Sequence, residues 1–387
     1  MLFAIITLMA LGAIAADMLR WRRLRRSSPG WHGAFVVYVA LTDLLLPAVV
    51  VSGALVRDNS TAFMAFAMWM FWAWMVTVLP RMAYYLCELL RLPHVGILAA
   101  LAVAGVLVWG ATAGRTTLHV TETEVCSAKL PEAFDGLRIV QLSDIHVGTL
   151  VRPERELSRL VDSVNSLRPD LVVFTGDLAN VRYTELNDRV QRLLGGLHAP
   201  LGVYSVTGNH DVGAYIKDTV ALPPAVNLQR LIAIEEGMGW QVLQDTTVYL
   251  HRGGDSIALS GIAFDPALRK RRHDAELPPA RLDVVYRDVA DSLFNLTAVH
   301  LPQLWGQITG AGYGDVTLAG HVHAMQLKIR LFGRYYSPAQ WLYTQWSGRY
   351  DDGPRMLYIN DGTGYVAYPM RLGAWPEITL ITLRRCA

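Results

Sequence analysis

Lysine is absent from the first 113 residues of this 387-residue chain, and charged side chains of any kind are scarce there. Those residues hold only 12 charged side chains, whereas the other 274 residues hold 56, a density much closer to that of soluble domains. The contrast excludes a uniformly soluble protein and a disordered chain, and the chain has no basic domain suited to nucleic acid. Three cysteines are too few for a disulfide-rich scaffold or a cysteine-based zinc site.

Long apolar runs fill the charge-poor part. Crossing a membrane takes about 20 mostly apolar residues, and four stretches meet that need: residues 2–19, 33–56, 62–79 and 95–113. The first stretch lacks the basic start and the cleavage site of a signal peptide, so we expect it to be retained as a helix. The sequence therefore predicts an all-α bundle of four transmembrane helices within residues 1–114.

Arginines mark the expected orientation of these spans. Five arginines lie at residues 20–26, and Arg81 and Arg91 lie between the third and fourth spans. The loop between the second and third spans holds only Arg57, beside Asp58. Because arginine-bearing loops stay in the cytoplasm, we expect the N-terminus and everything after residue 113 to be extracytoplasmic.

Two features leave alternatives open. Asp43 lies inside the second expected span, where a carboxylate is often functional; the preferred interpretation is a structural residue, paired or protonated within the bundle. Cys126 and Cys386 could form a disulfide in an oxidising compartment. Nothing in the sequence places their Cα atoms within the roughly 4.4–6.8 Å that a disulfide requires, so unpaired thiols are preferred.

After residue 137, short apolar runs alternate with amphipathic segments. Strands are expected at 137–142, 171–175 and 202–206, with helices at 153–167 and about 184–197 between them. This β-α-β-α-β order predicts an α/β domain over residues 137–387 with parallel strands at its core. Residues 115–136 are expected to form a connector that runs into an edge strand. Further strands are expected at 256–261, 297–300, 315–319, 356–360 and 378–383.

Polar residues follow five of these strands. In chain order they are Ser143-Asp144-Ile145-His146, Gly176-Asp177, Gly208-Asn209-His210-Asp211, His300, and Gly320-His321-Val322-His323. The carboxyl ends of strands form the ligand crevice in open α/β sheets, so these segments are expected to meet. Each motif alone is a weak signal, but the set together indicates a metal site.

The ligand types narrow the choice of metal. Carboxylates, an amide oxygen and imidazoles without thiolates are typical of Mn, Fe, Zn or Mg. The set is too large for one tetrahedral ion, so two divalent metal ions that share a carboxylate are expected, and Asp177 is central in the motif order. Such a pair clamps a phosphoryl group and generates hydroxide near neutral pH.

Together the five motifs resemble the calcineurin-like metallophosphoesterase superfamily over roughly residues 135–387. The sequence is most similar to its membrane-anchored bacterial branch, which shares a glycine-rich segment at 360–364, Pro369-Met370-Arg371 and a terminal Glu377-Ile378 strand. The resemblance implies a four-layer αββα fold and an integral protein of the bacterial inner (plasma) membrane. Ala324-Met325 replaces the branch's Gly-Gly and Asp361-Gly362 its Arg-Gly, so the pocket beside His323 is expected to differ.

The resemblance also implies a role for each site residue. Asp144, His146 and His323 would hold the first metal ion, and Asp177 would bridge. The second ion would be completed by Asn209, His300 and His321. The catalytic residue His210 would not ligate, but would contact the phosphate and help to protonate the leaving oxygen.

The expected activity is hydrolysis of a phosphoester or diphosphate bond by attack of a metal-bound hydroxide. The spans hold the site beside a bilayer, which favours a phosphorylated lipid or envelope substrate. The superfamily includes sugar-nucleotide lipid pyrophosphatases, but an extracytoplasmic site counts against nucleotide-linked precursors because these are cytoplasmic. The alternative is a non-catalytic membrane sensor or binding protein, and the retention of every ligand position argues against it.

Two segments are candidates for the substrate entrance. The basic run 269–272 either meets anionic headgroups or is a solvated loop. The segment 332–350 is expected to lie in the membrane interface, to receive acyl chains, or to form a flap packed over the core, which is the preferred interpretation. Its aromatic residues are Phe332, Tyr335, Tyr336, Trp341, Tyr343, Trp346 and Tyr350.

Overall fold

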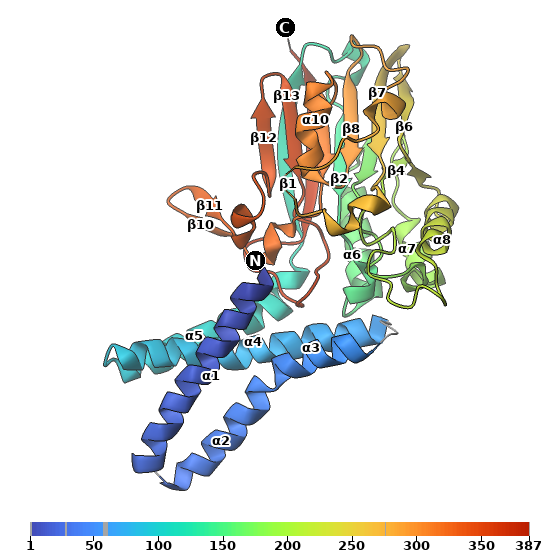
Figure 1. Ribbon diagram of the computed structural model, residues 1–387. Helices are drawn as coiled ribbons and strands as arrows, with labels where there is room; N and C mark the ends of the chain where they lie inside the picture. Colours follow the sequence, from blue (N-terminus) through green and yellow to red (C-terminus); the bar gives the residue numbers. More distant parts are fainter. Residues whose placement is uncertain (1, 28, 57–60, 275, 387) are drawn as a thin grey trace. The chain divides into compact units, whose positions relative to one another are not determined.

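The computed structural model describes residues 2–27, 29–56, 61–274 and 276–386. The chain divides into two compact units (Figure 1). The first unit comprises residues 1–113 together with 367–370, and the second comprises residues 114–366 together with 371–387. We describe each unit by itself.

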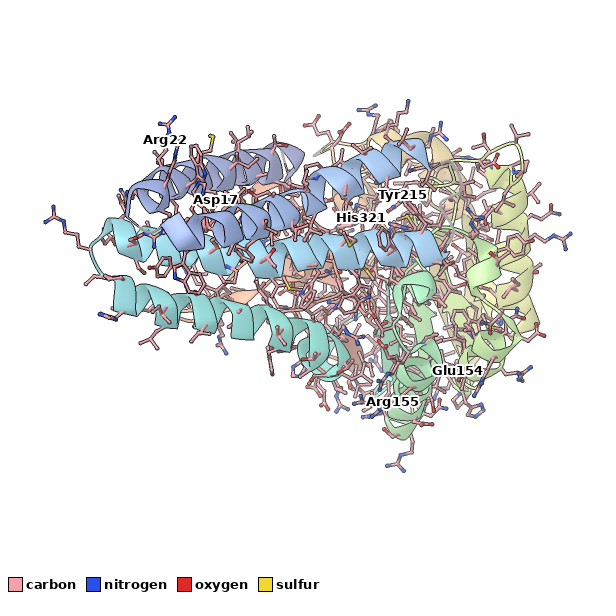
Figure 2. The ribbon with its side chains drawn as sticks, turned by 90° about the horizontal axis from the view of Figure 1, so that it is seen from below. Asp17, Arg22, Glu154, Arg155, Tyr215 and His321 are labelled. Carbon is pink, nitrogen blue, oxygen red and sulfur yellow. A yellow bond between two sulfur atoms is a disulfide. The ribbon has the colours of Figure 1, made fainter. Side chains whose placement is uncertain are left out.

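The first unit is helical, with α1 (Leu2–Ser27), α2 (Pro29–Asp43), α3 (Leu45–Leu55), α4 (Thr61–Leu89) and α5 (Pro93–Thr112). Within the described residues, three stretches are long and apolar enough to cross a membrane: Gly30–Leu55, Thr61–Leu89 and Pro93–Thr116. The predicted first span forms a helix but does not belong to this set. Residues 20–26, expected in a loop, form the last two turns of α1, and Arg22 points away from the helices (Figure 2).

Arg81 was expected in a loop, but it is buried inside α4. Its Nη2 lies 3.0 Å from an oxygen of Asp17 on α1, and it also pairs with Asp43 at the end of α2. Its Nη1 donates to the hydroxyl of Thr42 at 2.8 Å, and Tyr85 donates to the other Asp17 oxygen at 2.7 Å. This network joins α1, α2 and α4. It gives each of the three charges a partner of opposite sign, which matters because unpaired charge is costly in hydrocarbon. Asp43 is therefore a paired structural residue, as the preferred interpretation held.

Two six-stranded mixed sheets form the body of the second unit. The order in the first sheet is β1 (His119–Ser127), β14 (Glu377–Arg385), β2 (Arg138–Leu142), β3 (Leu171–Phe174), β4 (Val203–Ser205), β5 (Gln241–Val242). The order in the second sheet is β12 (Gly348–Asp352), β13 (Arg355–Ile359), β9 (Val316–Ala319), β8 (Asn295–Val299), β7 (Asp255–Ile262), β6 (Thr246–Arg252). The strands β2 to β5 are parallel, as are β13, β9, β8 and β7.

Alternating side chains place this unit's core on both faces of each sheet. On β2, Ile139 packs between the two sheets, whereas Val140 packs against the helices of the first sheet. Those helices are α6 (Pro153–Ser166), α7 (Asp188–Leu194) and α8 (Pro224–Gly237), while α9 (Leu282–Val285) and α10 (Trp305–Gly310) cover the second sheet (Figure 1). The result is a helix–sheet–sheet–helix arrangement of the α/β type.

All the predicted strands are present, and their ends lie within two residues of the expected ones. The predicted helix 184–197 is shorter, because Asn187 caps α7 by accepting hydrogen bonds from the backbone N–H groups of Arg189 and Val190. The connector does lead into an edge strand, β1, which pairs in parallel with β14. The edge strands β5, β6 and β12 were not predicted.

Cys126 and Cys386 form a disulfide, so the preferred prediction of unpaired thiols was wrong. The reason is the pairing of β1 with β14, which sets Cys126 opposite Arg384. This register brings the two cysteines together across 260 residues of sequence, with their Cα atoms 5.6 Å apart. Only the tertiary fold creates this proximity.

The aromatic segment 332–350 does not behave as one packed flap. Its first part belongs to a small hairpin of β10 (Ile329–Leu331) and β11 (Arg334–Tyr336), all of which is exposed. Tyr343, by contrast, is buried in a small cluster with Val322 and Ala339. The preferred prediction of a packed flap is therefore wrong for the hairpin, and in the later part Tyr343 is packed whereas Trp341 is exposed.

Candidate metal centre

The motifs singled out from the sequence lie directly after β2, β3, β4, β8 and β9. These strands are buried and parallel within their sheets, so their carboxyl ends bring the following residues to one edge. Five of the seven expected ligands have a positive φ, which residues other than glycine rarely adopt. These are Asp144 (53°), His146 (46°), Asp177 (59°), His321 (74°) and His323 (53°). The surrounding structure thus holds these ligands in strained conformations.

Three groups of side chains offer ligand atoms that lie within 4.8 Å of one another. One group is Asp144, His146 and His323, and another is Asp177, His300 and His321. The third joins His146 and Asp177 with His210. The amide oxygen of Asn209 lies 3.2 Å from Nε2 of His300. The structure therefore brings together all eight residues that the sequence singled out.

Ligand atoms in this cluster face one another inside the protein. Nε2 of His146 lies 3.1 Å from Nε2 of His323, and Nε2 of His300 lies 3.2 Å from Nδ1 of His321. Oδ1 of Asp144 is buried and lies 3.1 Å from Nε2 of His323 and 3.7 Å from Nε2 of His146. One proton shared between two ring nitrogens would satisfy a single facing pair. It would not satisfy several imidazole nitrogens and carboxylate oxygens that all face the same space. The donor set therefore fits divalent cations of the kind that bind imidazole and carboxylate.

The two carboxylates of the site are ionised. Burial alone would raise the pKa of Asp177, but the neighbouring His300 and His210 hold that pKa below its usual range. Burial acts in the same direction on Asp144, but His323, His146 and His300 together hold its pKa well below the usual range. Negative charge is thus available to both ligand groups at neutral pH.

A hydrogen bond from the ring nitrogen that faces away from the site fixes the orientation of His300. Its Nδ1 donates to the carbonyl oxygen of Thr175 at 2.8 Å, which turns Nε2 toward the site. Gly176 makes this contact possible: its φ is +93°, and a Cβ there would lie 2.9 Å from Nδ1 of His300. A side chain at position 176 would displace the imidazole.

Asp211 supports the site without belonging to the ligand groups. Its carboxylate accepts hydrogen bonds from the backbone N–H groups of Asp177 (2.7 Å), Leu178 (3.0 Å), Ala179 (3.1 Å) and Gly208 (2.8 Å). These bonds fix the loop after β3 against the loop after β4. The sequence placed Asp211 in a motif but gave it no role.

Arg371 was also missed as a site residue, although it belongs to the Pro-x-Arg segment. It is fully buried and donates to the carbonyl oxygens of Gly364 at 2.7 Å and Ala374 at 2.9 Å. Its Nη2 lies 3.2 Å from Nδ1 of His323. The conformation of His323 therefore depends on a segment 48 residues further along the chain.

His210 lies beside the ligand groups. Its Nδ1 is 2.5 Å from the carbonyl oxygen of Asn180, which leaves Nε2 on the side of Asp177, 4.0 Å from Oδ2. Burial, helped by His146, lowers the pKa of His210 to about 3, although Asp177 acts in the opposite direction. The ring is therefore neutral at neutral pH.

Aromatic and basic side chains border the same site. The ring of Tyr215 lies 4.1 Å from that of His210, and the guanidinium carbon of Arg272 lies 5.1 Å from the Tyr215 ring centroid. On the other side, the hydroxyl of Tyr343 is 3.3 Å from Nε2 of His321. Tyr215 and His321 come from different segments (Figure 2). The last residue of the basic run 269–272 thus lies near the expected ligands.

Comparison with known proteins is consistent with this geometry. The family model for calcineurin-like phosphoesterase matches residues 137–325. The UDP-2,3-diacylglucosamine pyrophosphatase LpxG of Chlamydia trachomatis is 37% identical, over 76% of this chain and 98% of that protein. The uncharacterized metallophosphoesterase YkuE of Bacillus subtilis is 29% identical, over 75% and 95%. A transmembrane protein with metallophosphoesterase domain from Danio rerio is 30% identical, over 75% of this chain and 62% of that protein.

Proposed function

The chain belongs to the calcineurin-like phosphoesterase family and is a metal-dependent phosphoester hydrolase, and we propose that it is a membrane-anchored enzyme with two divalent ions that acts on a lipid-linked or envelope substrate. One observation carries the proposal. Asp177 belongs to one buried ligand group with His300 and His321 and to another with His146 and His210, and His146 also belongs to the group of Asp144 and His323. Oδ2 of Asp177 is 3.2 Å from Nε2 of His300 and 3.8 Å from Nε2 of His146, so one carboxylate faces both groups.

We assign Asp144, His146 and His323 to the first ion, Asn209, His300 and His321 to the second, and Asp177 to both. Two divalent ions at such a site supply Lewis acidity toward a phosphoryl group. The protein contributes ionised carboxylates and imidazoles that Thr175 and Arg371 hold in place.

His210 is proposed to contact the phosphoryl group and to assist the leaving oxygen, because its Nε2 faces Asp177 and the ligand groups. The ring is neutral in the free protein, so this role requires the negative charge of a bound phosphate to raise the pKa of His210. Arg272 is proposed to bind a further phosphate of a diphosphate substrate. Its guanidinium stands over Tyr215, whose ring packs on His210, and a guanidinium forms strong charge-assisted hydrogen bonds with phosphate. This pairing gives the site a preference for diphosphates over monoesters.

The second unit is proposed to be extracytoplasmic. The arginine-rich end of α1 precedes three apolar stretches, so a cytoplasmic position for that end puts the second unit outside, whether or not α1 itself spans. We retain α1 as a fourth span, because Asp17 pairs with Arg81 and Arg20 pairs with Glu88. The disulfide gives independent support, since disulfides persist in oxidising compartments.

The substrate is proposed to be an amphiphile with a phosphoester or diphosphate headgroup. The Chlamydia relative is named for a diphosphate of a diacylated sugar nucleotide. An extracytoplasmic site disfavours that nucleotide-linked lipid and favours phospholipids, isoprenoid diphosphates or envelope phosphodiesters.

The test uses the purified full-length protein in lipid nanodiscs, stripped with a chelator and reloaded with Mn²⁺. The panel contains phosphatidic acid, an isoprenoid diphosphate, a UDP-linked diacyl sugar and a water-soluble nitrophenyl phosphodiester, with released products measured by mass spectrometry. We expect metal-dependent cleavage of a lipid substrate at a higher kcat/KM than the soluble ester. A metal-loaded protein that cleaves none of them would instead indicate the sensor or binding protein.

A further inference from the structure

The β10–β11 hairpin stands apart from both large sheets. Its two strands pair only with each other, with Ile329 opposite Tyr336 and Leu331 opposite Arg334. Figure 1 shows the hairpin projecting from the side of the second unit's sheets. An isolated two-stranded hairpin is marginal in water, so a surface that receives it would explain its presence.

Its side chains are apolar and exposed. Phe332 at the turn is fully exposed, and Leu331 and Tyr335 on either side of it are 50% and 52% exposed. Ile329 and Tyr336 are exposed as well. A contiguous apolar patch of this kind marks an interaction site.

The inner side of the hairpin does not pack on the core. Lys328, Arg330 and Tyr335 line a cavity of about 750 Å³ between the hairpin and the sheet edges. The two strands of the hairpin therefore stay exposed and are not packed on the sheets as a flap would be.

The charged side chains in the hairpin and in the sequence directly around it are all basic. Between Asp315 and Asp351 the sequence has no acidic residue, while it has four basic residues: Lys328, Arg330, Arg334 and Arg349. Lys328 is paired with Asp361. In the part of the chain that the structure describes, Arg330 and Arg334 form no ion pair, and Arg330 lies over the ring of Tyr335 at 5.6 Å.

We propose that the β10–β11 hairpin docks on an anionic lipid bilayer, with Phe332 and its apolar neighbours in the interfacial region and Arg334, which shares a face with Leu331, on lipid phosphates. Aromatic side chains prefer the membrane interface, and arginines near it are attracted by anionic headgroups. A bilayer is the occupant that this composition favours, because the same chain has three apolar stretches long enough to span one. The hairpin begins six residues after His323, so docking would hold the metal centre close to the lipid surface.

The test places a fluorophore on the full-length protein in nanodiscs. In a Cys87→Ser background, which keeps the disulfide, Phe332→Cys is labelled with an environment-sensitive dye. His251→Cys, on the exposed edge strand β6, is the matched control. We expect blue-shifted emission at position 332 and quenching by doxyl lipids several-fold stronger than at position 251. The effect should be larger with phosphatidylglycerol than with phosphatidylcholine alone, and weaker at high salt.

Equal quenching at the two positions would overturn the proposal. So would protection of position 332 that depends on protein concentration, because that result would indicate a second copy of the chain. Arg334→Gln should reduce quenching at position 332 only in anionic nanodiscs, and an equal loss in neutral ones would contradict the role of charge. None of these readouts depends on enzymatic activity, so they stand apart from the proposed reaction.

Discussion

Replacing Asp177 with Asn tests the shared ligand most directly. The side chain is 2% exposed, and Oδ2 lies 3.2 Å and 3.8 Å from imidazole nitrogens of the two ligand groups. Asn keeps the shape, and its amide oxygen can still accept the His210 backbone N–H that Oδ1 accepts at 2.8 Å. A unit charge pair about 4 Å apart is worth about 4 kcal/mol at an effective dielectric constant of about 20. Since 1.4 kcal/mol is a factor of ten, losing the charge should weaken metal binding by about 10³-fold.

The measurement combines metal content after desalting, calorimetric titration with Mn²⁺ and the rate of hydrolysis. Circular dichroism should show an unchanged fold, because the substitution conserves volume. Asp162→Asn, which changes an exposed carboxylate on α6, is the matched control and should bind metal normally. A D177N protein that retains two metal ions and most of its rate would refute the assignment of Asp177 to both ions.

Three further predictions follow from the proposals. His210→Ala should leave metal content unchanged and slow hydrolysis by roughly 10²–10⁴-fold for a poor leaving group, but much less for nitrophenolate; equal losses for both leaving groups would exclude His210 as the acid. Arg272→Ala should lower kcat/KM for a diphosphate more than for a nitrophenyl monoester, and an equal effect would contradict the second phosphate contact. A reporter fused to the C-terminus should be active only when exported, and a membrane-impermeant maleimide should label Cys126 and Cys386 in intact cells only after reduction. A cytoplasmic reporter signal would contradict the orientation, and labelling without reductant would contradict the disulfide.

The candidate site was predictable because its chemistry is local. Asp144 and Asp177 each follow an apolar run within a few residues, and the β-α-β order requires parallel strands whose ends share one edge. The same rule for strand ends led to the expectation that His323, which follows a strand of the second sheet, meets His146, 177 residues earlier. The family resemblance added their roles, and the structure places every one of those residues at the same edge.

The supporting residues were not predictable in this way. Arg371 contacts His323 across 48 residues, and the disulfide joins residues 260 apart. Both contacts exist only because β14 and the segment before it return to the first sheet. The edge strand β6 is a different case, since Gly253-Gly254 before β7 is a hairpin signal within the sequence itself. Because β6 is partly exposed, too few of its residues are apolar for the alternating pattern of a strand to be recognised.

Arg81 shows what a sequence window misses in the membrane part. The apolar composition led to the expectation that the third span ends before Arg81, which was therefore counted as a loop charge. In the structure Arg81 lies inside α4 and pairs with Asp17 and Asp43. Its charge is therefore neutralised within the bundle and does not bear on orientation. Removing it from the count leaves the proposed orientation unchanged, because the five arginines at the end of α1 outweigh Arg57, which lies outside the described residues.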